Sequence, residues 1–384
     1  MLALALVVVA GIVVTRLSRP SLRHPLLDGI LATGVPFVLL GALLGPGLGV
    51  FDGPGMQALR PVVALGIGWI GASFGARLEW RMLRRVSRRT WLVGATLAVP
   101  VLLTTTVTAW VLARSVPSLA DAWGRPILPV ALVLAGAATT AASWRGPRLG
   151  RRNALLDTAF GAAAVAAGVA LYDPHLALRS ILLTLVASGG LGGLIVAVTH
   201  WQKDRTDAGV AIELFGAILW GAGFSYATGL SPFVVCALIT AVIVSFSPAA
   251  VRHTVQKLLR TWEIPLYATF LIIAGALLHH FTAWILAAAL SLAVVRAAVR
   301  WVTVRFGVDQ GDPVWRSLPF APPPEFAFPA ARQGAAAVAL AAGFELVHGG
   351  SGAVLLTVLL SVLAAEALVV LTPLTAAPPR AEVT

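Results

Sequence analysis

Apolar segments recur along the whole chain, and only short polar stretches separate them. About thirteen of these segments meet or approach the ~17–25 residues that a helix needs to cross a bilayer. With 58% hydrophobic and 11% charged residues, the composition excludes a soluble globular domain. The sequence therefore predicts an all-α polytopic membrane protein with about thirteen transmembrane helices. We expect a single transmembrane domain over residues 1–375 and a short cytoplasmic tail over residues 376–384.

Several of the expected spans are short for a straight crossing of the bilayer, so they must tilt or be interrupted. The N-terminal segment counts as a span, because it lacks the basic start and cleavage site of a signal peptide. The spans are Leu2–Val14, Ile30–Leu44, Val62–Phe74, Trp91–Leu112, Ile127–Ser143, Ala154–Leu171, Leu178–Val198, Ile212–Tyr226, Phe233–Phe246, Pro265–Leu278, Trp284–Val302, Phe326–Phe344 and Ala353–Leu371.

Basic residues alternate in density between successive loops. Twenty-two arginines and lysines follow odd-numbered spans or lie in the tail, whereas four follow even-numbered spans. The positive-inside rule then places the N-terminus outside and the C-terminus in the cytoplasm of a cell membrane. This asymmetry also accounts for the net charge of +12, so we expect no nucleic-acid partner.

Helix breakers and polar residues interrupt particular spans. Gly45-Pro46-Gly47 is expected to end the second span, Pro232 to open the ninth and Ser247-Pro248 to close it. The fifth and twelfth spans are both polar near the middle, through Thr139-Thr140 and Arg332-Gln333. Because these two spans lie seven apart, they predict an inverted repeat of about six helices, whose interrupted members mark a transport site.

Five stretches, taken together and in order, resemble the monovalent cation:proton antiporter superfamily, the sodium/proton exchanger type of membrane domain. The first is similar to the family's "aGillGPxxLG" stretch, the second to its "GLE" helix followed by basic residues, the third and fourth to "GLSpilGAFlaGlxxsxsp", and the last to its "RGexalvla…lE" helix. They are Val35–Gly49, Ala76–Arg81, Gly229–Leu238, Ser245–Pro248 and Arg332–Leu340, the last followed by Phe344-Glu345.

The resemblance implies inverted repeats with two crossing discontinuous helices, here the fifth and twelfth spans, and a homodimer with a rigid interface bundle and a mobile core. It also implies exchange of sodium or potassium for protons by alternating access. In the family, aspartates in the sixth span hold the cation or the proton. The matching positions here are Ala163 and Ala164, or Phe160 and Gly161 in another register, and none is acidic. A competing alignment places Glu325–Phe328 on the family's "GEFAF".

Six residues are therefore candidates for an ion or proton pathway. Asp157 is either a carboxylate near the helix N-terminus, favoured by the dipole, or a relocated ligand. Thr139 and Thr140 either bond back to the preceding turn or supply hard oxygen ligands at an unwound helix. Arg296 lies deep in the eleventh span, where an arginine needs a polar partner. Arg332 and Gln333 in the twelfth span complete the set of candidates, Arg332 either as a similar residue or as lining of a cytoplasmic funnel.

Other chemistry is not expected. No phosphate-binding loop, nucleophile elbow or zinc motif occurs, so we expect no enzyme and no cofactor. His279-His280 has no further ligands at metal-binding spacing, and the single Cys236 excludes an intramolecular disulfide. The expected partners are monovalent cations, protons, the lipid bilayer and a second copy of the chain. The alternative function is a degenerate antiporter-like protein without proton coupling, acting as a scaffold, sensor or partner subunit.

Overall fold

A computed structural model describes residues 35–47, 53–84, 88–140, 148–172, 174–201, 206–276, 282–309, 335–348 and 351–371, and these residues form only helices and short connections. The helices are α3 Val35–Ala42, η2 Leu43–Gly47 (a π-helix), α4 Gly53–Gly75, α5 Trp80–Arg84, α6 Arg88–Ser115, α7 Pro117–Trp123, α8 Ile127–Thr139, α9 Arg148–Tyr172, α10 Pro174–Trp201, α11 Asp207–Thr228, α12 Pro232–Phe246, α13 Ala249–Ala276, α14 Ala283–Asp309, α16 Ala335–His348 and α17 Ala353–Leu371.

A helix occupies every predicted span from the second to the thirteenth, and the predicted all-α fold is confirmed. The expected breakers act as predicted, since η2 ends at Gly47 and α12 runs from Pro232 to the residue before Ser247. The first predicted span, Leu2–Val14, and the tail lie outside the described residues.

The start of the tenth span was predicted wrongly. Helix α13 begins at Ala249, so Pro265 lies inside it and the stretch expected to be a loop is helical. The reason is amphipathicity, because Val251, Val255 and Leu259 recur every fourth residue and are buried while the residues between them are mostly polar. Overall hydrophobicity misses such a half-polar helix end.

Short helices are common in the described part of the chain. Four helical stretches there are long and apolar enough to cross a membrane unaided, namely Gly94–Ser115, Leu178–Trp201, Asp207–Thr228 and Ala283–Thr303. The unpredicted α7 and the following α8 meet the test only as a pair, and they are bent by 76°. α12, α16 and most of α9 are apolar but shorter, so the polar site is built from interrupted or short helices.

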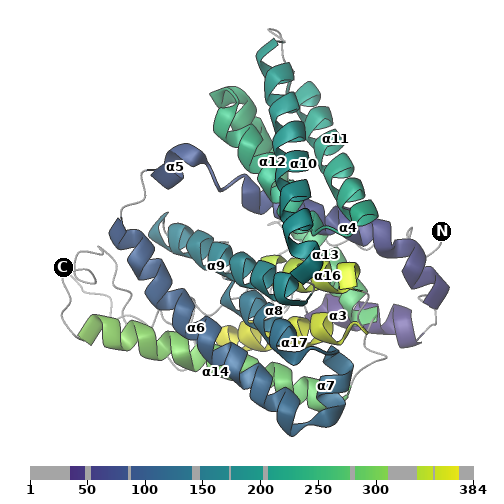
Figure 1. The fold of residues 1–384 in the computed structure, drawn as a ribbon, viewed down its shortest axis with the longest axis vertical. Coiled ribbons are helices and arrows are strands. Elements are labelled where there is room, and N and C mark those ends of the chain that lie inside the picture. The colour runs from purple at the N-terminus through teal and green to yellow at the C-terminus, as the bar shows by residue number, and fades with distance from the viewer. Residues whose placement is uncertain are drawn as a thin grey trace, which may run out of the picture.

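The helices gather into two bundles, each around its own buried apolar cluster. Figure 1 shows α10, α11, α12 and α13 standing together, with α6, α8, α9, α14 and α17 forming the other group. Buried residues of α4, α11, α12 and α13 make up one cluster, which we call the first bundle. Residues of α6, α7, α8, α14, α16 and α17 dominate the other cluster, which we call the second bundle. α4 borders both clusters, through Trp69 on one side and Phe74 on the other.

The pairing of helices in the first bundle has the symmetry of an inverted repeat. α4 packs along α12, and α3 packs along α13. An offset of seven spans relates α3 to α12 and α4 to α13, so it converts one pair into the other. Both pairs are parallel and closely packed: Gly71 and Gly75 face Phe233 and Ala237, and Gly41 and Gly45 face Ile272 and Ala276. A Cβ on Gly75 or Gly41 would collide with the facing carbonyl oxygen, which explains the small residues.

Candidate functional site

Helices α8 and α9 pack backbone to backbone, as the alanine- and glycine-rich sequence of α9 predicts. A Cβ on Gly136 would lie 2.6 Å from the carbonyl oxygen of Gly161, and one on Gly161 would collide with the carbonyl oxygen of Gly136. Only glycine allows two helix backbones to approach this closely. The same face of α9 carries Asp157, which this packing brings to the end of α8.

Helix α8 stops in the protein interior at Thr139, and Thr140 has an extended backbone (φ −59°, ψ 143°). Both side chains are fully buried. The Oγ1 atoms of Thr139 and Thr140 donate to the carbonyl oxygens of Ala135 and Ala137, each at 2.8 Å. The hydroxyl groups therefore bond back within the helix, which is the simpler of the two predicted alternatives. The main-chain carbonyls at the end of the helix, which carry its negative dipole end, are left to other partners.

Two arginines of α14, one helical turn apart, supply those partners. Arg296 donates from Nε to the carbonyl oxygen of Ala138 and from Nη2 to that of Thr140, the latter at 3.0 Å. Arg300 donates from Nη2 to the carbonyl oxygen of Thr139 at 3.0 Å. Arg296 is 0% exposed and Arg300 3%. Two buried guanidinium groups thus hold the end of the interrupted helix and oppose its negative dipole end.

Asp157 completes this cluster, which we call the arginine site: Thr139, Thr140, Asp157, Arg296 and Arg300. Its Oδ2 atom lies 2.7 Å from Nη2 of Arg300, and the residue is 2% exposed. Its Oδ1 atom is buried and has no hydrogen-bond partner among the described residues. Because α9 begins at Arg148, Asp157 lies more than two turns inside the helix. It is therefore too deep to cap the free N–H groups of the first turn.

The structure brings together Thr139, Thr140, Asp157 and Arg296, four of the residues singled out in the sequence. It also adds Arg300, which sequence reasoning counted among the loop arginines after the eleventh span. The available signal was its spacing of four residues from Arg296, which puts both on one face of a helix. Arg332 and Gln333, the alternative Glu325–Phe328 segment and the His279-His280 pair lie outside the described residues.

The positions that match the family's aspartates face away from this cluster. Gly136 and Gly161 mark the contact between α8 and α9, whereas Ala163 is exposed and Ala164 half-buried. Helix α16, the described part of the predicted twelfth span, packs against α8 from the opposite half of the chain. The arginine site thus lies where the two predicted repeats meet.

With this geometry in place, comparison with known proteins is informative about the fold. No protein-family model and no curated protein sequence matches the chain. Among solved structures, the chain is similar to the sodium proton antiporter MjNhaP1 from Methanocaldococcus jannaschii, with a TM-score of 0.63 and 13% sequence identity over 96% of each chain. The two chains share one fold. The predicted antiporter-like architecture of a membrane transport protein is thereby confirmed.

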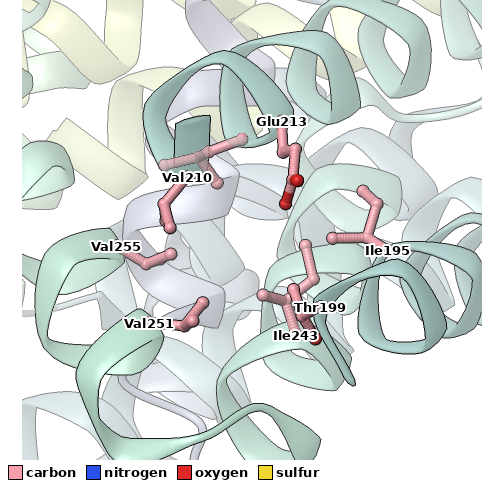
Figure 2. A pocket seen from close by; sticks show the side chains of 8 residues that line it. Ile195, Thr199, Val210, Glu213, Ile243, Val251 and Val255 are labelled. Carbon is pink, nitrogen blue, oxygen red and sulfur yellow. The ribbon is translucent and has the colours of Figure 1, made fainter. Parts of the chain in front are cut away.

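A shallow pocket lies in the first bundle, apart from the arginine site. It encloses about 200 Å³ together with its open mouth, and α10, α11, α12 and α13 line it. Figure 2 shows Glu213 directed toward a lining that is otherwise aliphatic apart from Thr199. None of its lining residues belongs to the helices that build the arginine site.

Proposed function

We propose that the chain is a transporter that exchanges a monovalent cation, sodium or potassium, for protons by alternating access. One observation carries the proposal: Asp157 presents a buried carboxylate oxygen without a hydrogen bond at the end of an interrupted helix. A buried carboxylate that lacks one partner gains from binding either a proton or a hard cation. One group that holds either of them, but not both, couples the two fluxes.

Arg300 is the competitor in this scheme. While Asp157 is empty and ionised, Arg300 satisfies Oδ2 and offsets the cost of the buried charge. Protonation of Asp157 removes the charge that attracts the guanidinium group, and a bound cation repels it. Arg300 keeps a second acceptor, the carbonyl oxygen of Thr139, so it has a partner during the exchange. The hydroxyl oxygens of Thr139 and Thr140 retain lone pairs that are suited to a monovalent cation.

The similarity to an antiporter structure supports this proposal at the level of the fold. We extend it with the expectations for the whole assembly: a homodimer in the cell membrane, with the N-terminus outside and the C-terminus in the cytoplasm. In this scheme the second bundle moves against the first and carries the arginine site between the two membrane surfaces.

A second candidate function rests on the charge count of the arginine site. Two guanidinium groups face one carboxylate among the described residues, and the residues at positions 163 and 164 are alanines. An excess of positive charge weakens the binding of cations. The alternative is therefore an antiporter-like protein without proton coupling that serves as a scaffold, sensor or partner subunit.

Proton flux in liposomes that contain only this protein separates the two. If the chain is an antiporter, a sodium or potassium gradient drives saturable proton movement, and Asp157→Asn abolishes it without unfolding the protein. Asp121→Asn is the matched control, because Asp121 also pairs with an arginine, Arg125, but both side chains are exposed. Absence of cation-driven flux in the native protein supports the uncoupled alternative. Robust antiport that survives Asp157→Asn refutes the assignment of Asp157.

A further inference from the structure

The short helix α5 lies in the connection between the two bundles. Figure 1 shows it as a separate piece between α4 of the first bundle and α6 of the second. Its beginning is fixed to the first bundle by three contacts. Glu79 pairs with Arg252 of α13 at 2.7 Å, the backbone N–H of Trp80 donates to Ser245 Oγ at 3.0 Å, and Gln256 Nε2 donates to the carbonyl oxygen of Ala76 at 3.3 Å.

Beyond these anchors the side chains are basic, aromatic and exposed. Arg81, Arg84 and Arg88 are exposed, and Trp80 is 51% exposed. The Arg84 guanidinium lies over the Trp80 ring, 5.3 Å from its centroid. No acidic side chain in the described part of the chain pairs with any of the three arginines, because the nearby Glu79 is held by Arg252. We call Trp80, Arg81, Arg84 and Arg88 the α5 patch.

We propose that the α5 patch binds the phosphate headgroups of anionic phospholipids. Tryptophan side chains favour the headgroup level of a bilayer, so Trp80 sets the depth of the patch. Arginine presents several N–H donors in a planar fork that fits phosphate oxygens, and negative lipids attract clustered basic residues near the membrane surface. Four residues separate Arg84 from Arg88, a distance of at most about 14 Å, so neighbouring headgroups can bridge them.

A loop that only obeys the positive-inside rule needs charge but no fixed arrangement. Here the backbone before the patch is held by α12 and α13, and Arg84 is held against an exposed ring. Such pre-organisation lowers the entropy lost when a headgroup is bound. Because α5 is fixed to the first bundle and leads into α6, bound lipid would hold this connection at the bilayer surface.

The test compares lipid binding by the full-length protein and its variants. Native mass spectrometry of detergent-solubilised protein, titrated with phosphatidylglycerol or with zwitterionic phosphatidylcholine, measures the affinity for each lipid. We expect preferential retention of phosphatidylglycerol and a fall of at least about tenfold in its affinity for Arg81→Gln/Arg84→Gln/Arg88→Gln, since each basic residue contributes to the attraction. The control is Arg114→Gln/Arg125→Gln/Arg179→Gln, which removes the same charge from exposed arginines, including Arg114 over the Trp110 ring. Its phosphatidylglycerol affinity should stay near that of the native chain.

Three further measurements separate headgroup binding at the α5 patch from a packing role and from a general charge effect. The Arg→Lys triple variant at the α5 patch should retain the preference for phosphatidylglycerol, which a packing role of the arginines would not allow. Phosphatidylglycerol should raise the thermal midpoint of the native protein, and salt at about 1 M should reduce this increase because it screens exposed charges. Equal loss of affinity in both glutamine variants, or equal stabilisation by inorganic phosphate, would overturn the proposal. If the glutamine variant does not fold, the salt and lysine results decide.

Discussion

Arg300 and Asp157 form an ion pair of 2.7 Å in which the side chains are 4% and 3% exposed. The same Nη2 atom of Arg300 donates to the carbonyl oxygen of Thr139, so one guanidinium nitrogen joins α14 to both α8 and α9. A pair buried to this degree has lost its water, and each partner depends on the other. The end of the interrupted helix and the carboxylate of the neighbouring helix are therefore coupled.

This coupling predicts the behaviour of Arg300→Gln. Removing one partner of a buried pair leaves an uncompensated charge, so we expect a loss of about 3–5 kcal/mol in the free energy of unfolding. Asp157→Asn/Arg300→Gln should lose less than the sum of the two single variants, because the unpaired charge is gone. A double-mutant cycle on unfolding in detergent measures the interaction. Additive losses would show that the pair contributes no coupling energy.

Arg296→Leu tests the other arginine. It removes the donors to the carbonyl oxygens of Ala138 and Thr140, so we expect α8 to lose its fixed end and transport to fall sharply. An unpaired charge at such depth would itself cost at least ~2.5–3.5 kcal/mol, which is why its polar surroundings are required. Arg260→Leu, at an exposed position of α13, is the control and should be nearly silent. A silent Arg296→Leu would remove this residue from the site.

Gly161→Ala tests the close packing of α8 and α9. The added Cβ would collide with the carbonyl oxygen of Gly136, so the helices must separate, and we expect a cost of about 1–3 kcal/mol. Gly190→Ala is the matched control, since no atom lies within 4 Å of its added Cβ. That change should be neutral or slightly stabilising, because alanine favours a helix. Unfolding midpoints of the two variants give the comparison, and equal midpoints would contradict the observed packing.

The orientation prediction rests on the 22-to-four asymmetry of basic residues. In a chain without Cys236, a cysteine at Arg84→Cys should be shielded from an impermeant reagent added outside, and one at Ser231→Cys should react. The reverse labelling pattern would invert the whole assignment, including the membrane surface at which the α5 patch lies.

Sequence alone predicts most of the fold, because hydrophobic length, helix breakers and arginine asymmetry are strong one-dimensional signals. It finds α17 at its observed bounds, but it misses α7 and the amphipathic start of α13, where only one face is apolar. Within the arginine site it identifies Asp157 and Arg296 from the cost of charge in a membrane. It misses Arg300, because only the packing of α14 against the end of α8 shows that this arginine is buried rather than in a loop.

The absent aspartates lead to the last prediction. An aspartate at Ala164→Asp would join Asp157 on α9 as a second acid, two turns further along the helix, and add the negative charge that the arginine site lacks. Because Ala164 is half-buried, we expect this change to create or strengthen sodium-dependent proton movement in liposomes. Ala163→Asp should do so less, because position 163 is exposed and its carboxylate keeps the properties of a solvated or headgroup-level acid. Equal flux in the native chain and in both variants would mean that the sixth span does not carry the exchanged proton, and the search for it would move to other helices.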